Sequence, residues 1–175
     1  MESYQRLEAE WAEFNGLDPN GMVACSSGTA ALHLALESFC LPPNSEVITP
    51  DFTMVACARA VTLAGTKPVF VDCDERLMMD VTLVESCVRE KLGEEIYAGG
   101  DLVGWKGLAT APWVIMPVHV YGRQCDMDAL ARVACKYDLV IVEDLAEAHS
   151  VRPHPSTDAA CWSFFKNNCD NWFFV

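Results

Sequence analysis

The sequence has 175 residues, 51% of them hydrophobic, which is enough for one domain with a substantial core and too short for two full domains. Its net charge is -13, and Lys and Arg are scattered without a basic cluster, which argues against nucleic acid as a partner. The first residues lack the pattern of a signal peptide, and no apolar run approaches the roughly 20 residues that span a bilayer. We therefore expect a cytoplasmic protein with no membrane contact.

The nine cysteines are an odd number, and no two are spaced as Cys-x-x-Cys. Most of them lie in apolar segments, where a free thiol packs like a small hydrophobic side chain. We therefore expect reduced thiols rather than a disulfide framework or a zinc site. His149 and His154 are close in sequence, but no further residues have ligand spacing, so no metal site is predicted.

The chain opens with a predicted amphipathic helix. Tyr4, Leu7, Trp11 and Phe14 recur at helical spacing, and Gly16 follows where a helix would end. Predicted strands and helices then alternate. The strands are expected at 22–25, 46–49, 68–72, 113–120, 139–142 and 159–165, and the helices at 30–39, 53–63, 81–92 and 127–137.

This alternation indicates right-handed crossovers and a mainly parallel sheet covered on both faces. The predicted fold class is therefore α/β, as a three-layer α/β/α arrangement. The long polar insertion at 93–107 is predicted to be a surface loop.

The segment 26–29, Ser-Ser-Gly-Thr, joins a predicted strand to a predicted helix. Hydroxyl groups and free amides at a helix N-terminus can hold an anion such as a phosphate. The same residues also form ordinary turns and helix caps. Both interpretations stay open from the segment alone.

Ionisable side chains cluster after the apolar strand at 139–142. Glu143 and Asp144 follow it directly, with Glu147 and His149 a few residues later. Open α/β sheets bind their ligands at the carboxyl ends of the strands, and such groups are costly to bury without partners. We therefore predict a site here, although Asp144 is also suited to capping the next turn. His119 likewise ends an apolar strand and is interpreted as a structural histidine.

Six short motifs, taken together and in order, resemble those of the DegT/DnrJ/EryC1/StrS family of sugar aminotransferases. They are Ser27-Gly28-Thr29-Ala30-Ala31, Pro50-Asp51-Phe52-Thr53, Pro68-Val69-Phe70-Val71-Asp72, Pro117-Val118-His119-Val120-Tyr121-Gly122, Glu143-Asp144-Leu145-Ala146-Glu147-Ala148-His149 and Ser163-Phe164-Phe165. The resemblance implies the large domain of a fold type I pyridoxal 5'-phosphate (PLP) enzyme. It also implies a homodimer that aminates nucleotide-linked keto-sugars, with glutamate as the usual amino donor.

The resemblance assigns roles to several residues. Gly28 and Thr29 would hold the cofactor phosphate with help from Ser163. Asp144 would pair with the pyridine nitrogen and keep it protonated, which makes the ring an electron sink.

Other positions depart from the family or support the site. Glu147 stands where the family usually has a glutamine that contacts the ring hydroxyl, and a carboxylate cannot donate a hydrogen bond unless it is protonated. Met54 stands where an aromatic residue often stacks on the ring. His149 is expected to support the geometry of the site.

The Schiff-base lysine of the family lies five residues after the equivalent of Ser163, and this position is Asn168 here. Lys166 is the nearby candidate, but it comes two residues earlier. On a strand, a two-residue offset shifts the ammonium group by about 6.6 Å from the position that the family uses. No Gly-rich segment or C-terminal small domain follows, so residues 1–175 are expected to be a truncated large domain.

Three functions follow from these observations. The first is an aminotransferase fragment. The second is a sugar dehydratase-like protein of the same family, since some members replace the lysine with a histidine. The third is a non-catalytic binding or oligomerisation module.

Overall fold

The computed structural model describes residues 3–92, 112–164 and 173–174. The described helices are α1 (Ser3–Asn15), α2 (Gly28–Ser38), α3 (Val55–Leu63), α4 (Val81–Leu92) and α5 (Met127–Tyr137), with single 3₁₀ turns η1 (Pro19–Gly21) and η4 (Val120–Gly122). The described strands are β1 (Ala24–Cys25), β2 (Glu46–Pro50), β3 (Lys67–Val71), β4 (Pro112–Ile115), β5 (Val140–Asp144), β6 (Ala159–Ser163) and β7 (Phe173–Phe174).

These strands form one seven-stranded sheet in the order β1-β7-β6-β5-β4-β2-β3. The run from β6 to β3 is parallel throughout, whereas β7 is antiparallel to both β6 and β1. Because β7 is antiparallel to both of its neighbours, β1 runs in the same direction as β6. The prediction of a mainly parallel, mixed sheet is confirmed.

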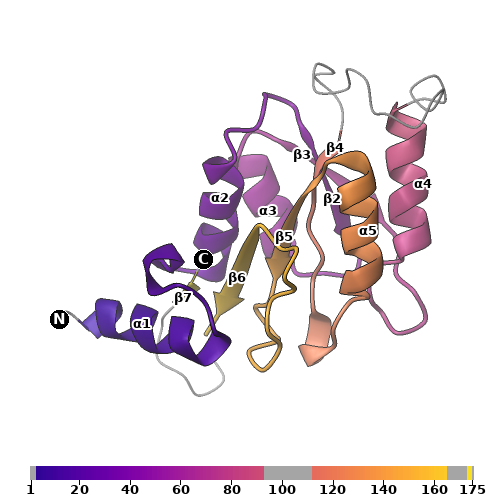
Figure 1. Cartoon of the computed structure of the whole chain (residues 1–175). Helices are drawn as coiled ribbons and strands as arrows, with labels where there is room; N and C mark the ends of the chain where they lie inside the picture. The colour runs from indigo at the N-terminus through magenta and orange to yellow at the C-terminus, as the bar shows by residue number, and fades with distance from the viewer. Residues whose placement is uncertain (1–2, 93–111, 165–172, 175) are drawn as a thin grey trace.

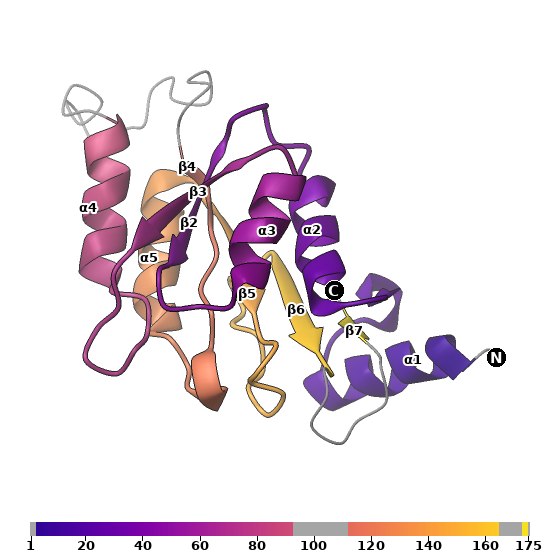
Figure 2. The same cartoon turned by 180° about the vertical axis from the view of Figure 1, so that it is seen from behind.

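Helices cover both faces of this sheet (Figure 1). Helices α2 and α3 pack together on one face, and α4 and α5 lie on the other, as the two opposite views show (Figure 2). The central strands are buried by both layers, and Val47, Ile48, Val114, Ile115 and Ile141 are at most 1% exposed. The three-layer α/β/α prediction is therefore confirmed.

A second, smaller core lies where α1 meets the β1–β6 end of the sheet. Its buried members include Ala12, Met22, Leu145 and Trp162. Trp11 of α1 packs edge-on against Trp162, with ring centroids 6.0 Å apart. The predicted apolar face of the opening helix is what forms this contact.

The prediction of a strand over 113–120 is wrong for its second half. β4 ends at Ile115, and the chain continues through an isolated bridge between Val118 and Asp144. Pro117 has no amide hydrogen to give to a ladder, which favours an end to regular pairing. The segment then bends into η4, where Tyr121 has a φ of 55°.

Other boundaries differ by a few residues. The predicted strand at 139–142 extends to Asp144 as β5, so Glu143 and Asp144 are its last two residues rather than the start of a loop. The predicted strand at 22–25 is only the two-residue β1, and β7 was not predicted. The predicted loop at 93–107 lies outside the described residues.

Candidate functional site

The sheet register brings three polar strand ends to one edge. Asp144 pairs with Cys161, and Ser163 lies two residues further along β6. Phe173 pairs with both Ser163 and Cys25, so the end of β1 lies level with Ser163, two strand spacings or about 9.6 Å away. Helix α2 begins just after β1, and its N-terminus therefore belongs to the same edge.

Asp144 is buried at this edge, with 4% of its surface exposed. Its Oδ2 accepts a hydrogen bond from the Cys57 thiol (3.1 Å), and its Oδ1 accepts one from the Ala146 amide (2.9 Å). Its backbone is held as well, since its amide donates to Pro117 O (2.9 Å) and its carbonyl accepts from the His119 amide (3.0 Å). The carboxylate is thus fixed in orientation.

Burial raises the pKa of Asp144 above its usual value, because desolvation disfavours the charged form. The hydrogen bonds from Cys57 and Ala146 oppose this shift, and so does the nearby His119. The charge of Glu147 raises the pKa of Asp144 slightly further. A cation beside this carboxylate would therefore be bound favourably.

Glu143, the residue before Asp144, points to the opposite face of β5 because side chains alternate along a strand. Its Oε2 accepts a hydrogen bond from His119 Nε2 (2.7 Å), and its Oε1 accepts from the His154 amide (2.7 Å) and the Thr157 hydroxyl. Burial raises the pKa of Glu143, but these hydrogen bonds outweigh it and hold the pKa below its usual value. The sequence cluster is thus split between two faces.

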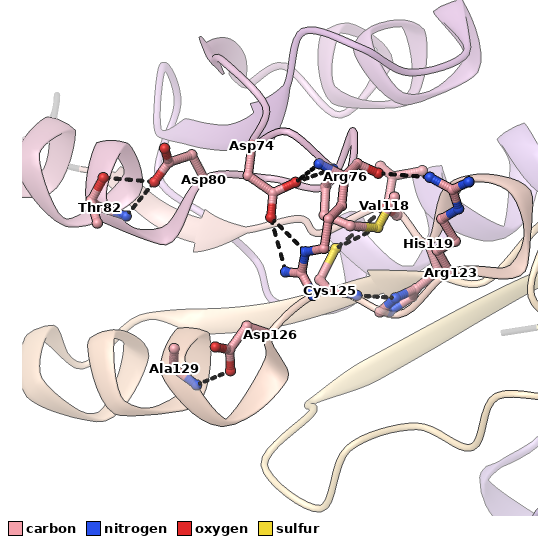
Figure 3. Close-up of polar contacts among 11 residues, drawn as sticks. Asp74, Arg76, Asp80, Thr82, Val118, His119, Arg123, Cys125, Asp126 and Ala129 are labelled. Carbon is pink, nitrogen blue, oxygen red and sulfur yellow. Dashed lines mark hydrogen bonds and ion pairs between the residues drawn. The ribbon is translucent and has the colours of Figure 1, made fainter.

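His119 is fully buried and satisfied on both ring nitrogens. Its Nδ1 accepts a hydrogen bond from the Cys125 amide (3.1 Å; Figure 3). Nε2 therefore carries the proton that is donated to Glu143. The Cys125 thiol donates to Val118 O (3.4 Å) in the same turn. This arrangement fits a structural histidine that fastens the segment after β4 to β5.

The N-terminus of α2 supports both interpretations of the Ser-Ser-Gly-Thr segment. Ser27 is the N-cap, and its Oγ accepts from the Ala30 amide (3.0 Å). The Ala31 amide donates to Ser27 O (2.9 Å). Helix geometry gives the amides of Gly28 and Thr29 no partner within the helix, so they are available to an anion.

Glu147 and Met54 both lie on the surface. Glu147 Oε2 accepts a hydrogen bond from the Tyr121 amide (2.8 Å), which ties the turn after β5 to η4. Met54 is the residue before α3 and is 64% exposed. The Phe52 and Tyr121 rings pack edge-on nearby, with centroids 6.4 Å apart.

His149 is joined directly to the end of β6. Its Nε2 donates to Ser163 O (2.7 Å), and its ring stacks on Phe164 with centroids 4.8 Å apart. Trp11 packs edge-on against both rings. The structure therefore connects His149 to Ser163, while Lys166 and Asn168 lie outside the described residues.

Sequence reasoning missed Cys57, which was counted only as a buried thiol. Cys57 follows Thr53 by one helical turn, and the two side chains are 3.0 Å apart. That spacing was the available signal. Its contact with Asp144 joins residues 87 positions apart and has no local signature.

The described residues contain no group of three or more His, Cys, Asp or Glu side chains placed to hold a metal ion. Each helix in the described ranges is too short or too polar to cross a bilayer.

Comparison with known proteins identifies relatives of this chain. The family model of the DegT/DnrJ/EryC1/StrS aminotransferase family matches residues 2–168. GDP-perosamine synthase of Caulobacter vibrioides is 34% identical over 167 residues, which are 92% of this chain and 39% of the relative. A UDP-N-acetyl-3-dehydro-alpha-D-glucosamine 3-aminotransferase of Acidithiobacillus ferrooxidans is also 34% identical, over 91% of this chain and 39% of its own length.

The fold has matches among solved structures as well. The putative sugar aminotransferase Spr1654 from Streptococcus pneumoniae, in its PLP form, superposes with a TM-score of 0.79 at 27% identity and covers 99% of this chain. This chain covers 45% of that structure and about two fifths of the curated relatives it matches. Because the family model matches nearly its full length, the chain belongs to the DegT/DnrJ/EryC1/StrS aminotransferase family.

Proposed function

We propose that this chain forms the cofactor-binding part of a PLP-dependent aminotransferase that acts on nucleotide-linked keto-sugars. The observation that carries the proposal is the shared sheet edge, where a buried carboxylate at Asp144 lies near a helix N-terminus. One strand spacing and a two-residue rise separate Asp144 from Ser163, which gives about 8 Å between their backbones. This distance suits a pyridine ring bound at one end and its phosphate at the other.

Each residue would then have a defined task. Asp144 would accept a hydrogen bond from the ring nitrogen and stabilise the proton on it. The amides of Gly28 and Thr29 would bind the phosphate at the positive end of α2, and Ser163 would complete the cradle. When bound, PLP supplies an electron sink for charge that develops on the amino carbon.

Two further residues would border this cradle. Met54 would pack on the ring face with its thioether in place of an aromatic side chain. His149 would act through Ser163, because its hydrogen bond to the Ser163 carbonyl holds the end of β6 in position.

The remaining parts of the proposal are carried by the family alone. Glutamate would be the amino donor, and the functional unit would be a homodimer. Lys166 is the candidate for the lysine that bonds covalently to the cofactor, although Asn168 occupies the position where the family places it.

Equilibrium titration with PLP tests the cradle. We expect the chain to bind PLP at least about tenfold more tightly than pyridoxal, because pyridoxal lacks the phosphate that α2 would bind. Asp144→Asn should weaken PLP binding about tenfold, since it removes a charge-assisted hydrogen bond. Asp138→Asn is the matched control, because it makes the same change just before the other end of β5. Equal binding of PLP and pyridoxal would contradict the proposed phosphate site.

The absorbance spectrum tests the lysine separately. With Asn168 in the family position, we expect the spectrum of the PLP complex to be the same in the original chain and in Lys166→Ala. Loss of a visible absorbance band in Lys166→Ala would show that Lys166 bonds to the cofactor.

A further inference from the structure

Three side chains form a hydrogen-bonded chain that leads to Asp144. Thr53 Oγ1 lies 3.0 Å from Cys57 Sγ, and Cys57 Sγ lies 3.1 Å from Asp144 Oδ2. Cys57 is fully buried in the first turn of α3, and its amide donates to Met54 O (3.1 Å). The thiol is therefore held in place by the helix that carries it.

The direction of these hydrogen bonds follows from the protons available. An ionised carboxylate only accepts, so the single thiol hydrogen of Cys57 points at Asp144 Oδ2. The sulfur then accepts from the Thr53 hydroxyl. Burial, and next the charge of Asp144, raise the pKa of the Cys57 thiol far above its usual value, so the thiol keeps its proton and remains a donor.

We propose that Cys57 is a positioning residue whose thiol, together with the Ala146 amide, fixes the Asp144 carboxylate to receive the cofactor ring nitrogen. The two donors each occupy a different carboxylate oxygen, which sets the plane of the group. Each oxygen keeps a second lone pair for a further donor. This inference rests on the proposed function, because it assigns the ring nitrogen as that further donor.

The surroundings of Asp144 explain why such donors are needed. The titratable groups that face it in the described structure are Cys57 from α3, Cys161 from β6, His119 from the segment after β4, and Glu147 from the turn after β5. Neither thiol brings a positive charge and Glu147 is acidic, whereas His119 favours the ionised form of Asp144 without a hydrogen bond to it, because its ring proton is donated to Glu143. The Cys57 thiol and the Ala146 amide are the two groups that hydrogen-bond the carboxylate directly, and the N-terminal turn of α3 lies beside it.

The first measurement needs no cofactor. Carboxyl carbon NMR of aspartate-labelled protein, with the signal assigned through Asp144→Asn, follows the titration of Asp144 directly. Cys57→Ala removes the donor and should raise the pKa of Asp144 by about one pH unit or more. Cys57→Ser keeps a donor and should leave that pKa near its original value. Cys125→Ala is the matched control, because it removes a buried sulfur that contacts Val118 O instead.

The second measurement is the dissociation constant of PLP for the same variants, read from quenching of tryptophan fluorescence. We expect Cys57→Ala to bind PLP about tenfold more weakly, and Cys57→Ser and Cys125→Ala to bind within about threefold of the original chain. Thermal unfolding of each variant verifies that it is folded. A merely structural thiol would not separate Cys57→Ser from Cys57→Ala in both the pKa and the dissociation constant.

The two measurements separate the possible failures. An Asp144 pKa that does not move in Cys57→Ala overturns the inference, as does unchanged PLP affinity in that variant. If the original chain shows no saturable PLP binding while the Asp144 pKa still shifts, the proposed function fails and the hold of Cys57 on Asp144 is supported.

Discussion

Removal of the Glu143 carboxylate should strongly destabilise the fold while leaving the hydrogen bonds of the Asp144 side chain in place. In Glu143→Ala, His119 Nε2, the His154 amide and the Thr157 hydroxyl lose their shared acceptor. His119 is fully buried, so water cannot easily replace the lost partner there. His154 and Thr157 are half-buried and can be reached by water more readily.

The expected loss can be estimated from these three contacts. An unsatisfied buried donor costs about 1 to 3 kcal/mol, more where it had bonded to a charged group, and each half-buried contact adds up to about 1 kcal/mol. Because His119 dominates, we expect Glu143→Ala to lower the free energy of unfolding by about 4 kcal/mol. This is a large share of the roughly 5 to 15 kcal/mol that holds a typical domain together.

Urea unfolding followed by tryptophan fluorescence, to which buried Trp162 contributes, measures this loss. Glu143→Gln keeps one acceptor oxygen and should lose about half as much. Glu90→Ala, an exposed change on α4, is the control and should stay within about 0.5 kcal/mol of the original chain.

The pH dependence gives an independent test of the same contacts. The folded-state pKa of Glu143 is lowered, so its stabilising contribution is present above the unfolded pKa of about 4.3 and is lost as the pH falls through the folded pKa. The stability difference between the original chain and Glu143→Gln should therefore shrink below about pH 4. A loss under about 1 kcal/mol in Glu143→Ala, or a difference with Glu143→Gln that stays constant down to pH 3, would refute the reasoning.

Three further changes have defined outcomes. Ser27→Ala removes the side-chain cap of the Ala30 amide and should lower the free energy of unfolding by about 1 kcal/mol in urea, with Ser27→Asp showing little loss. Glu147→Gln keeps an acceptor for the Tyr121 amide and adds a donor for the ring hydroxyl of PLP. Titration should therefore show about fivefold tighter PLP binding, and weaker binding would speak against that contact. Trp162→Ala should cost about 3 to 5 kcal/mol by thermal or urea unfolding because it empties the small core under α1, and a smaller loss would mean that α1 repacks.

Much of the fold was accessible from local sequence patterns. Apolar runs alternating with segments of helical spacing predicted the parallel sheet and its two helical layers, because burial on both faces leaves that periodicity in the chain. The alanine-rich segment predicted a helix from residue 30, and α2 begins two residues earlier, at Gly28, with Ser27 as its N-cap. The motifs also identified the family, since each is a short stretch read without knowledge of distant contacts.

Other features depended on residues that meet only after folding. β7 follows a stretch with no strand pattern of its own and pairs between β1 and β6, so its place comes from the two edges it joins. Beyond the end of β4, the isolated bridge between Val118 and Asp144 ties the next segment to β5. Neither the place of β7 nor this bridge leaves a mark in the local sequence.

Local sequence was enough to place Glu143 and Asp144 at the end of a buried strand, because an apolar run followed by carboxylates records that position. What each carboxylate contacts depends on the folded chain. Strand alternation sends Glu143 toward His119 on one face and Asp144 toward Cys57 on the other. Those partners come from distant parts of the chain, and hydrogen bonds between them exist only once the sheet and its helices have packed.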